Sequence, residues 1–145
     1  METKKYATAA AFRRALEDRL QDIAGKEGVD LQRLRRQVAF DRLLARLFQG
    51  GQPRVLPWVL KGGYAMELRI KAARTTKDID LTMRGPSSSG DKKDDKKNLA
   101  VLEKLQEAAA FSSDDFFVYT IGEPIADLDA APYSGARFTC AQSPK

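Results

Sequence analysis

Two polar motifs in the middle of the chain have residue types that suit phosphate and metal chemistry. Gly62 and Gly63 follow one apolar run, and Asp78 and Asp80 are separated by a single residue in a second run. Glycines lack a Cβ, so backbone N–H groups in such a turn can approach a phosphate. Carboxylates are the ligands that Mg²⁺ uses beside substrate phosphates. Either motif alone is more typical of an ordinary turn or an exposed strand face, but their combination predicts a nucleotide site.

The two aspartates are expected to share one face of a strand. Polar and apolar side chains alternate over residues 77–83, so Asp78, Asp80 and Thr82 should project to the same side. The rise per residue in a strand then separates the Cα atoms of the two aspartates by about 7 Å. Carboxylates at this spacing can share a cation, and with two metal ions they can activate a hydroxyl and stabilise leaving pyrophosphate. The basic residues available as counter-charges are Lys61, Arg69 and Arg74.

Composition restricts the chemistry further. The 145-residue chain contains no histidine and a single cysteine, Cys140. These counts exclude an internal disulfide, a structural zinc cluster and a histidine-based catalytic triad. The net charge of +5 favours a polyanionic partner such as a nucleotide or RNA. Because there is no signal-peptide core and no apolar run near the roughly 20 residues that span a bilayer, we expect a cytoplasmic protein.

Two helices are predicted before the glycine pair. Apolar spacing over residues 9–20 indicates an amphipathic helix, and Asp30 can cap a second helix that ends near residue 48. The second helix would present a basic surface if its arginines clustered, the alternative being an ordinary solvated face. These arginines are Arg33, Arg35, Arg36, Arg42 and Arg46.

The glycine pair is predicted to lie between a strand and a helix. Residues 54–60 are apolar and β-prone, with Pro57 near the start of the strand, and good helix formers follow from Tyr64. Residues 84–98 have the composition of a flexible loop. After a further helix, a strand is expected over residues 116–121. It should turn at Gly122 and Pro124, and another strand should begin near residue 134.

These elements predict an α/β (α+β) domain with N-terminal helices packed on a small mixed sheet. One domain is expected over residues 1–145. It divides into a helical lead-in (9–48), a metal and nucleotide motif (55–84), the flexible loop (84–98), and a helix with strands (98–140).

The run "WVLKGGYAMELRIKAARTTKDIDL" resembles the AbiEii-type nucleotidyltransferase toxins of abortive-infection and toxin–antitoxin systems. Their motif reads roughly K-G-G-x-A-x-x-x-R and then R-x-T-x-D-I-D-L. The resemblance covers residues 30–82 well and the remainder loosely. The residues that match the motif are Lys61, Gly62, Gly63, Ala65, Arg69, Arg74, Thr76, Asp78, Ile79, Asp80 and Leu81.

The resemblance implies a DNA-polymerase-β-like nucleotidyltransferase core in which Asp78 and Asp80 are catalytic and hold Mg²⁺ or Mn²⁺. It implies transfer of a nucleotide from an NTP to an RNA acceptor such as a tRNA 3′ end, a role in phage defence, and a cognate antitoxin. Neither a membrane nor DNA is an expected partner. In some relatives, phosphorylation of a hydroxyl at the Thr76 position silences the enzyme, and a phosphate there would repel bound nucleotide. The implied nucleotide-binding residues are Lys61, Gly62, Gly63, Arg69, Arg74 and Thr76.

The family also uses a third carboxylate from a later strand and a C-terminal helical domain. Nothing after residue 140 resembles these parts, so we expect a truncated core with weak or absent transfer activity on its own. Asp127 and Asp129 are candidates for the third acid, although their segment reads as a loop. Three alternatives remain: a catalytically inactive fragment that binds tRNA or antitoxin, a nucleotidyltransferase acting on a small molecule, and a poorly folded remnant.

Overall fold

The computed structural model describes residues 6–49, 58–70, 77–83, 94–111, 115–127 and 136–144. Within these ranges the chain forms helices and strands, which confirms the predicted α/β (α+β) class. We expected one small mixed sheet, but the described strands form two antiparallel pairs, β1–β2 and β3–β4. The elements are α1 (Ala9–Glu27), α2 (Leu31–Leu47), β1 (Trp58–Lys61), α3 (Gly62–Arg69), β2 (Asp80–Met83), α4 (Asp94–Ala109), β3 (Phe117–Asp127) and β4 (Ala136–Pro144).

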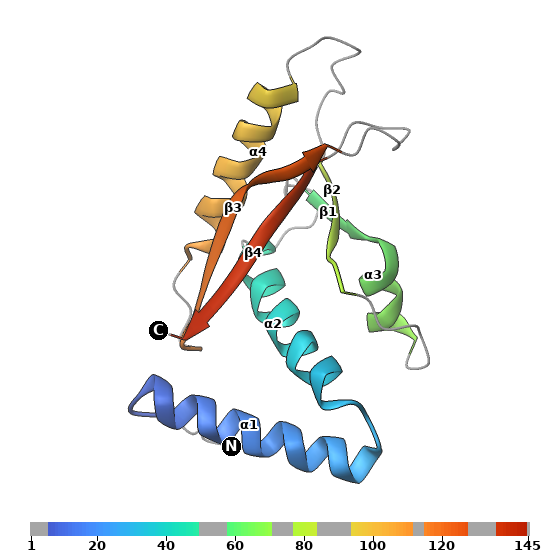
Figure 1. The fold of residues 1–145 in the computed structure, drawn as a ribbon, viewed down its shortest axis with the longest axis vertical. Coiled ribbons are helices and arrows are strands. Elements are labelled where there is room, and N and C mark those ends of the chain that lie inside the picture. Colours follow the sequence, from blue (N-terminus) through green and yellow to red (C-terminus); the bar gives the residue numbers. More distant parts are fainter. Residues whose placement is uncertain are drawn as a thin grey trace.

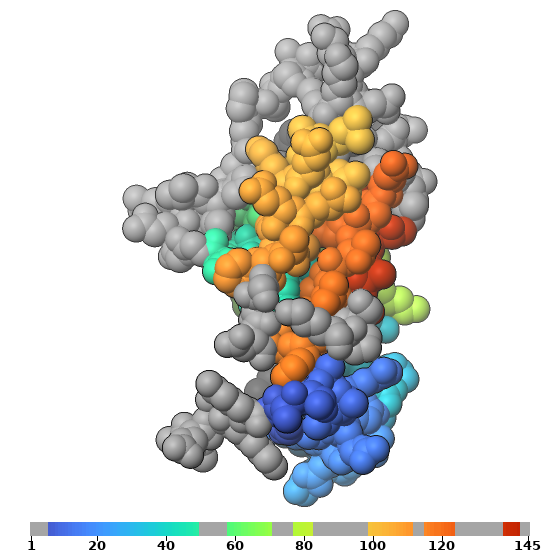
Figure 2. Space-filling model, turned by 90° about the vertical axis from the view of Figure 1, so that its left-hand side faces the viewer, coloured from blue at the N-terminus to red at the C-terminus, as the bar shows by residue number. Residues whose placement is uncertain are grey.

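Both strand pairs pack on the C-terminal part of the central helix α2, where Leu47 shares one hydrophobic cluster with Trp58 of β1 and Tyr119 of β3. In Figure 1, α1 crosses one end of the molecule and α2 runs from it into the centre. The helix α4 lies alongside the long β3–β4 pair, whereas α3 lies on the other side with β1 and β2. Figure 2 shows the face on which α4 and β3 are neighbours, with α1 below them against the lower end of β3. No helix in the described ranges has the length and apolar character that a bilayer span requires.

Capping interactions define the first two helices. The Thr8 hydroxyl accepts a hydrogen bond from the Ala11 N–H at 3.1 Å, and the Asp30 carboxylate accepts one from the Arg33 N–H at 2.9 Å. The predicted Asp30 cap is therefore confirmed. The first helix continues to Glu27, well past the predicted end at residue 20, because a helix can absorb the roughly 1 kcal/mol cost of an interior glycine at Gly25. It ends where Gly28 adopts a φ of +65°.

The C-terminal half differs from prediction in two places. The helix α4 begins at Asp94, inside the segment expected to be a loop, and residues 84–93 of that segment lie outside the described ranges. The predicted turn at Gly122 and Pro124 is wrong, because β3 continues through both residues to Asp127. Its pairing with β4 shifts register on both sides of Pro124. Such bulges accommodate a proline, which has no N–H to donate to the ladder.

One hydrophobic cluster joins the elements that surround the site. The Trp58 indole N–H donates to the Leu47 carbonyl at 2.8 Å, which ties β1 to the end of α2. Ile79 and Leu81 pack against the same cluster from the β2 side, so the core holds both strands of the β1–β2 pair. The buried members are Leu43, Leu47, Trp58, Leu102, Leu105, Ala109, Tyr119 and Ile121.

A buried ion pair connects α2 to the start of β3. The Arg46 guanidinium, 3% exposed, donates to both carboxylate oxygens of Asp115 at 2.9 and 2.6 Å. It also donates to the Phe117 carbonyl at 2.9 Å and lies over the Tyr119 ring. Burial opposes ionisation of Asp115, but hydrogen bonds from Arg46 and from the Phe117 N–H hold its pKa below the usual value. The pair is therefore charged at neutral pH, and both carboxylate oxygens of Asp115 accept hydrogen bonds.

Candidate functional site at the β1–α3 turn

The turn between β1 and α3 packs directly against the Asp80 carboxylate. Gly62 has a φ of +75°, a conformation that favours glycine. A Cβ placed on Gly62 would lie 3.0 Å from the Asp80 Cγ and 3.1 Å from its Cβ, with a carboxylate oxygen closer still. The antiparallel register of β1 and β2 sets Lys61 opposite Asp80. The glycine motif and the aspartate motif, separate in sequence, therefore meet at one point.

The aspartates lie on the solvent side of this segment. Asp78 and Asp80 are exposed, whereas Ile79 and Leu81 are half-buried against the core. The alternation expected from the sequence is therefore present in the burial of the side chains. However, the strand itself begins only at Asp80, and Asp78 lies in the bend that precedes it. Both carboxylates are accessible to a ligand arriving from solvent.

The remaining predicted site residues are distributed unevenly. Lys61 is exposed at the end of β1, and Gly63 is the second residue of α3. Arg69 is exposed in the last turn of α3, and the helical rise sets its Cα about 10 Å along the axis from Gly62. Arg74 and Thr76 lie outside the described ranges. The structure thus groups Lys61 and Gly63 with the Gly62–Asp80 contact and sets Arg69 at the far end of α3.

Substituting alanine for Gly62 should cost more stability than the same change at another left-handed glycine. Gly28 has a similar φ of +65°, but no atom lies within 4 Å of a Cβ built there. Gly28→Ala should therefore lower the free energy of unfolding by roughly 1 kcal/mol, the cost of a positive φ for alanine. Gly62→Ala adds the collision with Asp80, for a total of roughly 2–3 kcal/mol. Urea unfolding of both variants measures the difference. Equal losses would mean that the carboxylate does not pack against the turn.

Two residues of α3 that sequence reasoning missed dock this helix on α2. Tyr64 is 1% exposed, and its hydroxyl donates to Asp41 Oδ1 at 2.7 Å. Glu67, 7% exposed, accepts hydrogen bonds from Arg33 Nε at 2.9 Å and Gln37 Nε2 at 3.3 Å. Burial, together with the bond to Asp41, raises the pKa of the Tyr64 hydroxyl, so it remains a donor. The i,i+3 spacing of Tyr64 and Glu67 is the sequence signal that these residues share a helix face.

Four of the five α2 arginines that the sequence suggested as a basic surface lie close to acids of neighbouring elements. Arg33 contacts Glu67 of α3, and Arg35 contacts Glu17 of α1. Arg46 pairs with Asp115, and the Arg42 guanidinium lies 3.6 Å from the same carboxylate. These side chains instead tie α2 to its neighbours.

The candidates for a third acid are placed differently from expectation. Asp127 is the last residue of β3 and pairs with Ala136, so it belongs to a strand and not to a loop. Asp129 lies outside the described ranges. Across the part of the chain that the structure describes, no cluster of three or more histidine, cysteine, aspartate or glutamate side chains could hold a metal ion.

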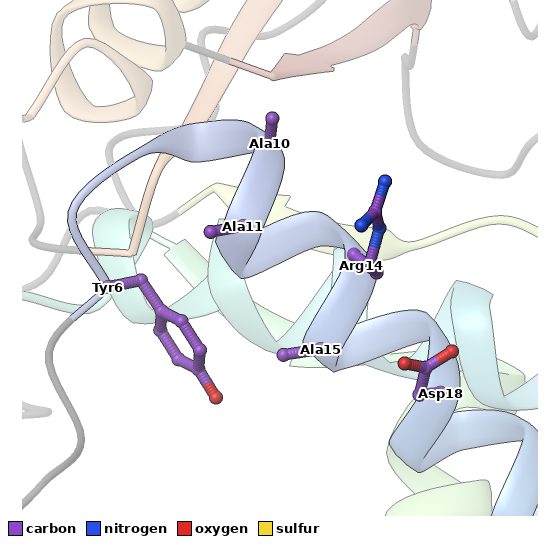
Figure 3. Close-up of a pocket in the computed structure, with 6 residues that line it drawn as sticks. All are labelled: Tyr6, Ala10, Ala11, Arg14, Ala15 and Asp18. Carbon is purple, nitrogen blue, oxygen red and sulfur yellow. The ribbon is translucent and has the colours of Figure 1, made fainter.

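A shallow hollow of about 500 Å³ lies on α1 and contains none of the predicted site residues. Figure 3 shows its lining along one side of α1, with Tyr6 extending beside the helix. Its other lining residues are three alanines, Ala10, Ala11 and Ala15, and the charged residues Arg14 and Asp18. The lining offers no arrangement of catalytic or ligand-binding groups comparable to the β1–α3 turn.

Comparison with known protein families identifies the family of this chain. Residues 42–144 match the family model described as "Nucleotidyl transferase AbiEii toxin, Type IV TA system". No curated protein matches the sequence. The matched segment begins within α2 and includes the glycine turn, both aspartates and the β3–β4 pair, whereas α1 precedes it. Because the match covers most of the 145 residues, the chain belongs to the AbiEii nucleotidyltransferase toxin family.

Proposed function

We propose that the chain binds an NTP with a divalent metal ion at the β1–α3 turn and transfers a nucleotide to an RNA acceptor. The family implies nucleotidyltransferase activity in general, an NTP substrate with a divalent metal, and a cognate antitoxin. The main support for the proposal is the contact of Gly62 with Asp80. This contact places a turn that can approach phosphate next to an exposed carboxylate that can bind a metal ion. The basic net charge of +5 supports an RNA acceptor.

The residues present fit a divalent cation such as Mg²⁺ or Mn²⁺. Asp78 and Asp80 supply hard oxygen ligands, and both side chains are exposed. The absence of a side chain on Gly62 is what allows the Asp80 carboxylate to lie against the turn. When bound, the metal would neutralise charge on the triphosphate and favour ionisation of the acceptor hydroxyl. Because the described residues contain no group of three or more such ligands, the remaining ligands of the cation would be phosphate and water oxygens.

The chain's own groups would act on the triphosphate at the same turn. The N–H groups of the first turn of α3, with Gly63 among them, have no acceptor within the helix and would donate to phosphate oxygens, and Lys61 would supply positive charge. The acceptor hydroxyl oxygen would bond to the α-phosphorus while pyrophosphate leaves. We assign Arg69, Arg74 and Thr76 to the surrounding nucleotide site on the family motif alone.

Removal of the metal provides the first test. The protein is incubated with labelled NTPs and total tRNA in Mg²⁺, and binding of a non-hydrolysable NTP analogue is measured in parallel by calorimetry. We expect EDTA to abolish binding and transfer, and added Mg²⁺ or Mn²⁺ to restore both, because the carboxylates would otherwise repel the triphosphate. Label transfer that persists in EDTA, or an affinity for the analogue that is the same with and without the metal, would contradict the proposal.

A further inference from the structure

The helix α3 carries the glycine turn, yet few contacts hold it. It contains eight residues, and its N-cap residue makes no side-chain capping hydrogen bond. Two large apolar side chains of the helix are about half exposed, Met66 at 51% and Leu68 at 55%, and so is the C-cap residue Ile70 at 47%. Its buried residues are Tyr64 and Glu67, both directed to α2. Tyr64 is therefore the one apolar side chain of this helix that is fully buried.

Tyr64 is placed to control the glycine turn. It follows Gly62 by two residues, within the first turn of α3, and is the most buried residue among those described. Its ring packs edge-on against Phe40 with centroids 4.9 Å apart, and its hydroxyl bonds to Asp41 at 2.7 Å. A hydrogen bond to a carboxylate is stronger than one between neutral groups. The position of the turn is therefore coupled to α2 through one ring and one hydroxyl.

We propose that Tyr64 and Asp41 are positioning residues for the nucleotide site, and that their hydrogen bond keeps the Gly62 turn against Asp80. This inference rests on the proposed function. Neither residue needs to touch substrate, because displacement of a site by about 1 Å is enough to weaken ligand binding severely. Glu67 supports the same docking one turn later, through Arg33 and Gln37.

The structure provides a matched control for removing the hydroxyl. Tyr119 is also buried, and its hydroxyl donates to the Ala39 carbonyl of α2 at 2.6 Å. However, Tyr119 lies on β3 and not on α3. The changes Tyr64→Phe and Tyr119→Phe therefore each remove one buried hydroxyl bonded to α2, and only the first loosens the helix that carries the glycine turn.

The test measures the affinity of each variant for a non-hydrolysable NTP analogue in Mn²⁺. Tyr64→Phe keeps the packing on Phe40 and should weaken binding roughly 10-fold, the equivalent of one lost bond to a charged group. Tyr119→Phe should leave the affinity unchanged. Asp41→Ala should match Tyr64→Phe, and Asp41→Asn, which keeps an acceptor oxygen, should recover most of the affinity. The double variant Tyr64→Phe/Asp41→Ala should be no weaker than either single variant.

Hydrogen exchange supplies a second readout that needs no ligand. Amides of residues 62–69 should exchange faster in Tyr64→Phe than in the wild type, and should be unaffected in Tyr119→Phe. If Tyr64→Phe binds the analogue as tightly as Tyr119→Phe does, while Asp80→Asn does not bind, the positioning role is wrong and the proposed function stands. If the wild type shows no metal-dependent binding, the proposed function fails and the positioning role fails with it.

Discussion

Asp80→Asn is expected to abolish metal-dependent nucleotide binding and to lower the rate of any nucleotide transfer by on the order of 100-fold or more. The substitution keeps the size of the side chain and removes its negative charge. The contact with Gly62 should therefore survive, while the principal ligand proposed for the cation is lost. Calorimetric titration of the NTP analogue in Mn²⁺ and label transfer to tRNA measure the two effects.

The control for this change is an aspartate distant from the turn. Asp22→Asn removes the same charge from an exposed ion pair with Lys26 on α1, and should leave binding and transfer unchanged. The comparison also separates catalysis from simple RNA binding, because loss of an acid leaves electrostatic RNA binding unchanged or stronger. Robust transfer by Asp80→Asn would refute the assignment of this carboxylate to the site.

Asp115→Ala should give the largest loss of stability, about 3–5 kcal/mol in the free energy of unfolding. The substitution leaves the Arg46 guanidinium buried without its carboxylate and removes the acceptor of the Phe117 N–H. A buried charge that loses its partner costs far more than an exposed one. Urea unfolding followed by circular dichroism measures the change, with Asp22→Ala as the exposed comparison, expected within about 0.5 kcal/mol of the wild type.

The same ion pair predicts the direction of a pH effect. The folded-state pKa of Asp115 is lowered, so its contribution to stability is complete above the unfolded-state value of about 3.9 and is lost as pH falls through the folded-state pKa. Wild-type protein should therefore lose stability below about pH 4 more steeply than Asp115→Ala does. Parallel acid titrations that coincide for the two proteins would show that the pair is not ionised in the native state.

Local patterns in the sequence predicted much of the fold correctly. The second helix and its Asp30 cap were predicted because capping and apolar periodicity depend on near neighbours. The order of strand, glycine turn, helix and second strand was predicted for the same reason. The continuation of β3 through Gly122 and the bulges around Pro124 were not predicted, because pairing with β4 overrides the local preference for a turn.

What the sequence by itself determined is the set of groups available for chemistry: a glycine pair, alternating aspartates and nearby basic residues, with the family motif that joins them. Their roles in binding and catalysis remain predictions. Only the tertiary structure decided that Gly62 lies against Asp80, because that contact depends on the register of β1 with β2. Only the tertiary structure decided that Arg33, Arg35 and Arg46 of α2 bind acids of other elements. Arg46 and Asp115, for example, are 69 residues apart in sequence. Contacts over such separations depend on how the elements pack. Periodicity along the chain indicates which face of an element is buried, but it does not specify the element against which that face packs.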